Sequence, residues 1–127
     1  MTFEELKDRT IVGLTEKIKV KSNSNVKELT ARIDTGATKS SIDIILASEL
    51  RLGPVIDSRL IKSAHGAKLR PVVKVEITMC GRTVSANFTL ADRNHMKYPV
   101  LIGQNILKKG FLIDPNKYAK KKKDKGC

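Results

Sequence analysis

One short segment of the chain combines the groups that hydrolysis of an amide bond requires. Ile33 is followed by Asp34, Thr35, Gly36 and Ala37. A carboxylate can act as general base or acid, a threonine hydroxyl can hydrogen-bond to a neighbouring loop, and glycine lets backbone approach a carboxylate closely. Two carboxylates held close together share one proton, so one activates water while the other supplies the proton. The segment occurs once, so the second Asp34 would have to come from another chain.

The sequence on both sides of this segment is typical of β-strands. Within residues 68–79, apolar side chains alternate with polar ones from Val73 to Met79, which predicts a half-buried strand. Residues 41–50 fit either a strand or one to two turns of helix. We expect strands at residues 10–20, 26–33, 68–79, 83–90, 98–102 and 111–113, and a short helix at residues 103–109 that ends at Gly110.

Several segments resemble those of the retropepsins, the family of the retroviral proteases. Residues 31–37 and 99–107 are similar to the two signature segments of that family. Residues 74–90 resemble the hairpin that precedes the second signature, and residues 63–67 stand where the family has the tip of its flap. The resemblance covers residues 10–114, which is nearly all of the part that we expect to fold.

A narrower resemblance is to a family labelled ATP-dependent zinc proteases. Its members have a retropepsin-like fold and are commonly associated with RimK-type glutamate ligases. The segments that carry this resemblance are Asp34–Ala37, Ser40-Ser41, Arg70–Val73, Arg93–Met96, Leu101–Gly103 and Phe111–Pro115.

The family label implies zinc and ATP, but the residues of this chain fit neither. Zinc needs three or four well-placed ligands, and the chain offers His65, His95, Cys80 and Cys127, scattered along its length. The sequence has no His-Glu-x-x-His motif and no Gly-x-x-x-x-Gly-Lys-Ser/Thr phosphate loop. We therefore expect no metal and no cofactor, and two reduced cysteines rather than a disulfide.

The resemblance implies an all-β fold, namely a small, partly closed, retropepsin-like (acid protease) barrel of about six to eight strands with one short helix. We expect a single domain over residues 1–115, followed by a basic, disordered tail over residues 116–127. In such a domain Ser40 and Ser41 would support the Asp34 loop by hydrogen bonds.

The resemblance also implies an aspartic endopeptidase that acts as a homodimer on a peptide or protein substrate, with Asp34, Thr35 and Gly36 as the catalytic residues. The substrate-binding residues would be Ala37, Thr38, Lys39, Ser63, Ala64, His65, Gly66 and Arg70. A simpler interpretation stays open for His65 as an exposed loop residue and for Arg70 as a member of a surface ion pair. The alternative function is a non-catalytic retropepsin-like domain that binds peptides or serves as a scaffold.

Two departures from the retroviral pattern bear on the dimer and the substrate. Thr38 and Lys39 stand where retroviral enzymes usually carry Asp residues, and Gln104 stands where many of them have Arg. The acidic–Arg pair that braces those dimers is therefore absent. Lys39 places a cation where substrate would lie, so our hypothesis is an acidic, glutamate-rich peptide substrate.

Charge and composition limit the other classes of partner. The net charge is +12, but six Lys and one Asp in residues 117–125 place +5 in the tail, so +7 is spread over the body. No segment resembles an RNA-binding strand pair or a recognition helix, so nucleic acid is not expected as the main ligand. No apolar run approaches the roughly 20 residues of a membrane span, and the N-terminal residues lack the apolar core of a secretory signal. We expect a cytoplasmic protein.

Overall fold

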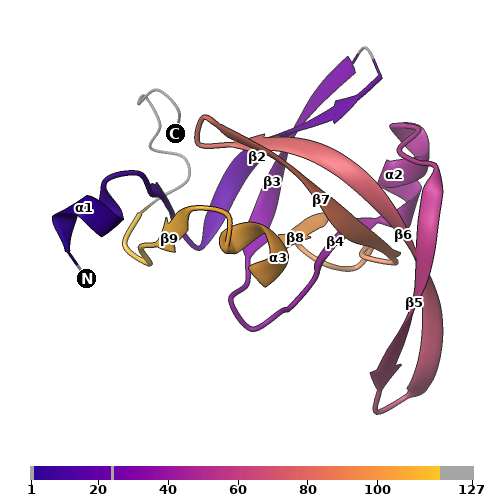
Figure 1. Cartoon of the computed structure of the whole chain (residues 1–127). Helices are drawn as coiled ribbons and strands as arrows, with labels where there is room; N and C mark the ends of the chain where they lie inside the picture. The colour runs from indigo at the N-terminus through magenta and orange to yellow at the C-terminus, as the bar shows by residue number, and fades with distance from the viewer. Residues whose placement is uncertain (1, 24, 118–127) are drawn as a thin grey trace.

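The computed structural model describes residues 2–23 and 25–117, and its main feature is a β-barrel (Figure 1). The described residues form nine strands and three short helices. The strands are β1 (Thr10–Val12), β2 (Thr15–Ser22), β3 (Asn25–Ile33), β4 (Ser40–Asp43), β5 (Val55–Ser63), β6 (Gly66–Met79), β7 (Arg82–Ala91), β8 (Val100–Ile102) and β9 (Phe111–Ile113). The helices are α1 (Phe3–Leu6), α2 (Ile44–Glu49) and α3 (Gln104–Leu107).

Six of the strands close into the barrel. The strand order is β2-β3-β8-β4-β7-β6-β5, and β2 also pairs with β6, which joins the first strand of this order to the sixth. Successive side chains of a strand point to opposite faces, so in β2 the buried Ile18 and Val20 alternate with exposed lysines. The buried side chains of the strands pack together with Ile106 and Leu107 of α3. The barrel interior is therefore a filled apolar core.

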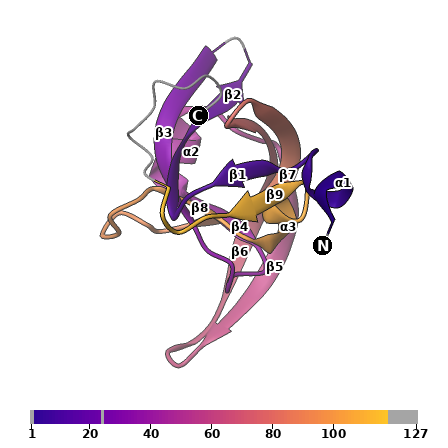
Figure 2. The ribbon, with the colours of Figure 1, turned by 90° about the vertical axis from the view of Figure 1, so that its left-hand side faces the viewer.

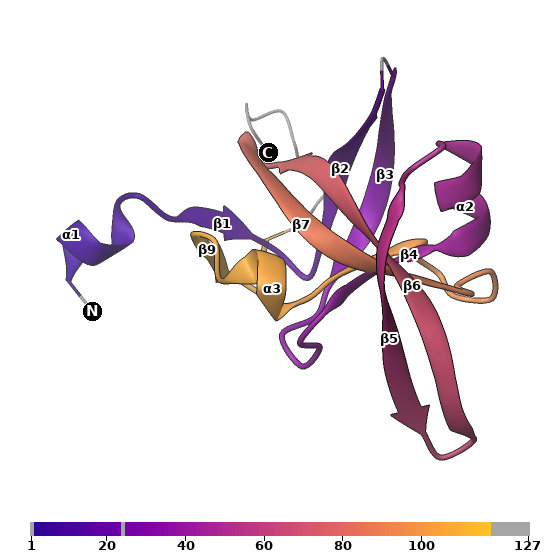
Figure 3. The same cartoon turned by 45° about the vertical axis from the view of Figure 1, so that its right-hand side comes forward.

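A long hairpin made of β5 and the first half of β6 extends beyond the barrel (Figure 3). In the described residues β5 pairs with β6 alone, so one strand anchors the hairpin to the barrel. At its tip Ser63 pairs with Gly66 across a turn at Ala64 and His65. Gly66 has a φ of +112°, which glycine adopts without the steric penalty that a Cβ would bring.

β8 separates the two strands that flank the Asp34 segment. β3 pairs with β8 in parallel, with Ile33 opposite Ile102. β4 pairs with the other edge of β8 in the antiparallel sense, with Ile42 opposite Val100. Residues 34–39, which we call the Asp34 loop, must therefore cross the end of β8 to connect β3 with β4. This crossing brings the loop next to the start of α3.

The two terminal strands pair with each other beside the barrel (Figure 2). β1 and β9 run in parallel, and Arg82 at the start of β7 holds them. Its Nε donates to Oγ1 of Thr10 at 3.0 Å, and its guanidinium carbon lies 5.6 Å from the centre of the Phe111 ring. Glu16, which is 2% exposed, accepts from Nζ of Lys117 at 2.6 Å. These contacts fasten both ends of the described chain to the barrel.

The all-β barrel expected from the sequence is confirmed, with differences in local detail. The strand expected over residues 10–20 is divided at Gly13, because β1 pairs with β9 while β2 belongs to the barrel. Residues 41–50 contain both alternatives, a strand and then a helix. The Asp43 carboxylate accepts from the Leu46 N–H at 3.2 Å and caps α2. Three short helices are present where one was expected.

Three further observations concern the tail, the cysteines and the helices. The tail expected over residues 116–127 lies, from residue 118 onward, outside the described residues. Cys80 is disulfide-bonded, so the expectation of a reduced thiol is wrong for Cys80, and Cys127 lies outside the described residues. Among the described residues no helix is long and apolar enough to cross a membrane.

Candidate active site

The Asp34 carboxylate is held at the end of β3 by the backbone of its own loop. The Asp34 N–H donates to the carbonyl of Ile102 at 2.9 Å. The Gly36 N–H donates to Oδ1 of Asp34 at 2.9 Å, and a Cβ at position 36 would lie 3.3 Å from the same oxygen. A side chain there would crowd the carboxylate. Asp34 is half-buried, and within residues 2–23 and 25–117 no donor occupies Oδ2.

The first turn of α3 clamps the other side of the Asp34 loop. The Gln104 N–H donates to the carbonyl of Ala37 at 2.8 Å, and the Asn105 N–H donates to the carbonyl of Thr38 at 3.2 Å. The first N–H groups of a helix have no partner within the helix, so the loop carbonyls satisfy them. The side chain of Gln104 also donates from Nε2 to the carbonyl of Thr35 at 2.7 Å. Loop and helix therefore fix each other.

Gly103 allows the loop and α3 to approach this closely. A Cβ at position 103 would lie 2.7 Å from the carbonyl carbon of Lys39 and 2.8 Å from the carbonyl oxygen of Ala37. These atoms are backbone and cannot move aside as the end of a flexible side chain can. A larger residue would therefore push the loop away from α3. This steric constraint explains why position 103, which is part of the family resemblance, is a glycine in this fold.

A buried serine completes the clamp between the loop and α3. Ser40 is 0% exposed, and its Oγ donates to Oδ1 of Asn105 at 2.7 Å and accepts from the Gly103 N–H at 2.9 Å. Nδ2 of Asn105 then donates to the carbonyl of Asn87 in β7 at 3.0 Å. The hydrogen bonding expected of Ser40 is present. The same network ties Ser40 at the start of β4 to α3 and to β7.

Arg93 and Asp43 brace the strand that follows the loop. Nε of Arg93 donates to the carbonyl of Tyr98 at 3.0 Å, and its Nη1 lies 3.5 Å from Oγ of Ser41. The Arg93 N–H donates to Oδ1 of Asp43 at 2.8 Å, while Oδ2 caps α2. Asp43 is 8% exposed and both of its oxygens serve backbone N–H groups. The Asp43 carboxylate therefore stabilises the local backbone structure.

The charges around Arg93 also describe the surroundings of Asp34. Burial lowers the pKa of Arg93 from its ordinary value, the nearby Asp43 carboxylate opposes this, and the cations Arg32 and Arg70 lower the pKa further. Asp34 acts on the same guanidinium in the opposite sense. Arg32, Arg70 and the Asp34 carboxylate thus each lie within electrostatic reach of Arg93. Such a cluster favours anions near the loop.

The residues predicted to bind substrate lie in separate parts of the structure. Ala37–Lys39 directly follow the carboxylate, and Lys39 is exposed. Residues 63–66 form the hairpin tip, and the hairpin extends from the same end of the barrel as the Asp34 loop (Figures 1 and 3). Arg70 is half-buried in β6, opposite Arg59 of β5. Their roles in binding substrate stay predictions.

A known protein family matches more than half of the chain. The profile of the RimB-like family, described as the retropepsin-like aspartic endopeptidase RimB, matches residues 45–124. The chain belongs to the RimB-like family. The matched segment begins after the Asp34 loop and contains the β5–β6 hairpin, α3 and β9. Among curated proteins none matches this chain.

Solved structures similar to this member of the RimB-like family share its fold. The Legionella pneumophila protein Lpg0085, of unknown function, is 20% identical with a TM-score of 0.62, over 89% of this chain and 98% of that one. The EIAV protease complexed with the inhibitor HBY-793 is 22% identical with a TM-score of 0.60, over 86% and 93%. The Simian Foamy Virus (mac) protease is 22% identical with a TM-score of 0.57, over 74% and 91%. Together these structures establish the retropepsin-like barrel.

No local pattern in the sequence pointed to the bonding partners of Gln104 and Asn105. Gln104 stood out only as a departure from the retroviral pattern and Asn105 only as part of a resembling segment, whereas their side chains hold the Asp34 loop and β7. The role of Arg93 was missed in the same way. For zinc, the described part of the chain contains no group of three or more His, Cys, Asp or Glu side chains that could hold a metal ion.

Proposed function

We propose that the protein is an aspartic endopeptidase in which each of two chains supplies one Asp34. The geometry of that carboxylate carries the proposal: Oδ1 accepts from the Gly36 N–H at 2.9 Å, while no donor in the described part of the chain occupies Oδ2. The loop is held between β8 and α3, which keeps the carboxylate in one orientation, as directed proton transfer requires. Membership of a family of retropepsin-like aspartic endopeptidases supports the same activity.

A homodimer would supply the second carboxylate. A two-fold interface presents the same surface from both subunits, so two Asp34 loops near the axis would face each other. One Asp34 carboxylate takes a proton from water, the water oxygen attacks the peptide carbonyl carbon, and the protonated partner donates to the carbonyl oxygen. The Thr35 hydroxyl joins the two loops, and residues 63–67 of each hairpin close over the substrate.

We infer an acidic, glutamate-rich peptide as the substrate. Lys39 is exposed in the Asp34 loop, and the guanidinium of Arg93, on which Arg32, Arg70 and Asp34 all act, adds positive charge within electrostatic reach of Asp34. Lys39→Glu should lower kcat/KM for glutamate-rich peptides and leave glutamine-rich peptides of the same length nearly unchanged, because only the former lose an attraction. Lys17→Glu, an exposed change in β2, alters net charge equally and is the control. An unchanged preference in Lys39→Glu would refute the substrate class.

The central test is a peptide-cleavage screen from about pH 3 to pH 8 that compares the wild type with Asp34→Asn. We expect Asp34→Asn to lose cleavage by about 10³-fold or more, since the amide neither accepts nor supplies the proton. Asp92→Asn is the matched control, because Oδ1 of Asp92 also accepts from an N–H two residues on, at 3.1 Å. Cleavage retained in Asp34→Asn would refute the mechanism.

The alternative is a peptide-binding or scaffold domain without catalysis, and one observation favours it. The sequence contains the Asp-Thr-Gly segment once, so a single chain lacks the second carboxylate that the catalytic mechanism needs. A chain that stays monomeric at working concentration, or that dimerises with its Asp34 carboxylates far apart, would retain the fold and lack the paired acids. Sedimentation equilibrium together with a crystal structure of any dimer distinguishes the two functions.

A further inference from the structure

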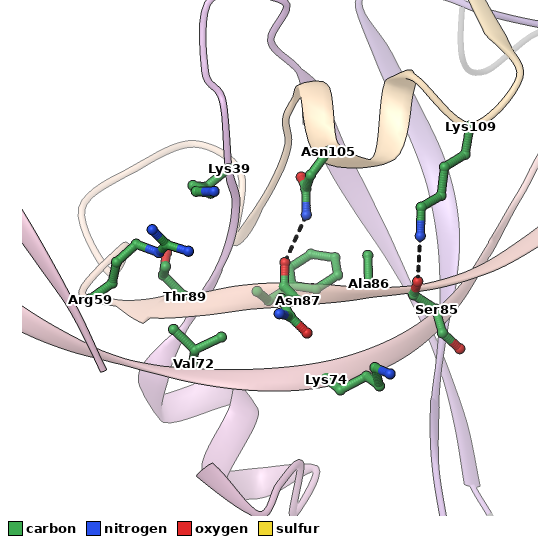
Figure 4. A pocket seen from close by; sticks show the side chains of 11 residues that line it. Lys39, Arg59, Val72, Lys74, Ser85, Ala86, Asn87, Thr89, Asn105 and Lys109 are labelled. Atoms are coloured by element: carbon green, nitrogen blue, oxygen red, sulfur yellow. Dashed lines mark hydrogen bonds between the residues drawn. The ribbon is translucent and has the colours of Figure 1, made fainter. Parts of the chain in front are cut away.

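A pocket lined by positive charge lies between the Asp34 loop, α3 and strands β5–β7 (Figure 4). Its volume is about 330 Å³, and four of its lining side chains are cations: Lys39, Arg59, Lys74 and Lys109. Among the described residues that line it, none is acidic. We call this the basic pocket. At the small end of the usual range for ligand sites, roughly 300–1,000 Å³, it suits a compact ligand rather than a folded partner.

The four cations come from four segments that are far apart in the sequence. Lys39 ends the Asp34 loop, Arg59 lies in β5, Lys74 lies in β6, and Lys109 follows α3. Figure 4 shows Lys39 and Arg59 on one side of the pocket and Lys74 and Lys109 on the other. The tertiary fold therefore gathers the positive charge, which a single basic run of sequence would not do.

Among residues 2–23 and 25–117, no carboxylate pairs with the cations of the basic pocket. Nζ of Lys109 donates to the carbonyl of Ser85 at 2.8 Å, which is a neutral partner. Like charges around one pocket repel each other. A bound anion would relieve this repulsion. An isolated surface lysine has no such repulsion to relieve.

The neutral lining of the basic pocket is made of polar groups and one buried aromatic ring. Between the two pairs of cations, Nδ2 of Asn105 donates to the carbonyl of Asn87 at 3.0 Å (Figure 4). The side chain of Asn87 adds an exposed amide to the lining, whereas the hydroxyl of Thr89, which is 5% exposed, donates to the carbonyl of Ser40 at 3.4 Å. The aromatic residue of the lining, Phe88, is 1% exposed, so it offers no face on which a nucleobase could stack. The chemistry of the pocket fits oxygen atoms that carry negative charge.

We propose that the basic pocket is an anion-binding site for a compact phosphate-bearing ligand, separate from the carboxylate of Asp34. A phosphate group places about two negative charges in a small volume, whereas a carboxylate supplies one. Two phosphate groups side by side would therefore match the two pairs of cations. Lysine binds such groups as a point charge, and arginine does so through its fork of donors.

Through Lys39, a ligand in the basic pocket affects the Asp34 loop. This residue belongs to both the basic pocket and the loop, and Arg59 belongs to the hairpin. A phosphate-bearing ligand bound between them draws on the positive charge of Lys39. The bound ligand also links the hairpin to the Asp34 loop. Occupancy of the basic pocket therefore changes the attraction between the Asp34 loop and an acidic peptide.

The test is calorimetric titration of the full chain with inorganic pyrophosphate, at low and at moderate salt. We expect saturable binding with one ligand per chain that weakens as salt rises, because the Debye length shortens. The double variant Arg59→Gln and Lys74→Gln should weaken binding about tenfold, since each exposed charge contributes up to about fivefold. The double variant Lys17→Gln and Lys27→Gln removes two exposed charges from β2 and β3 and should change binding less than about twofold.

Equal weakening in the two double variants would overturn the proposal, because it would mean diffuse attraction to a basic surface. Absence of saturable binding would overturn it as well. A blocked tetraglutamate peptide is titrated as the second arm, and a single-stranded oligonucleotide as the third. If either binds at Arg59 and Lys74 while pyrophosphate does not, the phosphate assignment is wrong. No hydrolysis is involved, so these results stand whether or not Asp34 proves catalytic.

Discussion

Ser40→Ala tests whether the clamp between α3 and the Asp34 loop stabilises the barrel as its geometry indicates. The substitution removes a donor to Asn105 at 2.7 Å and an acceptor for the Gly103 N–H at 2.9 Å, in a side chain that is 0% exposed. Each lost hydrogen bond costs about 1 kcal/mol, and a buried N–H left without a partner adds about 1 kcal/mol or more. We therefore expect the free energy of unfolding to fall by about 3 kcal/mol.

Urea unfolding followed by far-UV circular dichroism measures this loss, since the chain has no Trp for a fluorescence assay. For an m-value of about 2 kcal/mol per molar urea, 3 kcal/mol moves the midpoint down by about 1.5 M. The protein concentration must be the same throughout, because association of folded chains adds to apparent stability.

Ser41→Ala is the matched control for this experiment. Its hydroxyl is half-buried and lies 3.5 Å from Nη1 of Arg93, so it makes at most a weak hydrogen bond. We expect a midpoint shift of no more than about 0.3 M for this variant. Similar shifts in the two serine variants would refute the reasoning. A double-mutant cycle of Ser40→Ala with Asn105→Ala should give a coupling of about 1 kcal/mol, and a coupling near zero would show that the bond contributes nothing.

Three other substitutions probe the contacts that surround the barrel. Gly103→Ala should lower the free energy of unfolding by about 3 kcal/mol, because a Cβ there meets loop backbone; wild-type stability in the same urea titration would contradict the clash. Arg82→Lys should loosen the β1–β9 pair by about 1 kcal/mol, because lysine loses the fork of donors and the contact with the Phe111 ring; hydrogen exchange of the β1 amides should then accelerate. Glu16→Gln should lower the free energy of unfolding by about 3 kcal/mol, because it removes the negative member of a largely buried ion pair. In thermal unfolding its melting temperature should therefore fall well below that of Glu28→Gln, an exposed change in β3.

Alternation of apolar and polar residues predicted the core-facing half of β6, and partial alternation predicted β2 within the strand expected over residues 10–20. In β2 and β6 this two-residue period decides which side chains face the core, so the pattern and the fold agree. Residues 41–50 stayed ambiguous because their apolar run fits the periods of both strand and helix. The capping bond from Leu46 to Asp43 resolves the ambiguity, and a bond of this kind becomes visible only in the folded chain.

The hydrogen bonds that position Asp34 could not be predicted from the sequence. Ser40 lies 65 residues from Asn105, and Thr35 lies 69 residues from Gln104. Each of these side chains can bond to many partners, and nothing in the local sequence selects among them. The family resemblance indicated which segments lie against each other. The need for glycine at position 103 became clear only from its short distance to the backbone of the Asp34 loop.

The position of β8 between β3 and β4 has a consequence for the newly synthesised chain. Asp34 leaves the ribosome before the strand and helix that hold its loop, which follow only at residues 100–107. A nascent chain that has not reached this point lacks both the β8 ladder and the α3 clamp, and contacts between distant segments form late. The carboxylate is therefore oriented only once nearly all of the barrel has been made, which delays any hydrolytic capacity until the protein itself is folded.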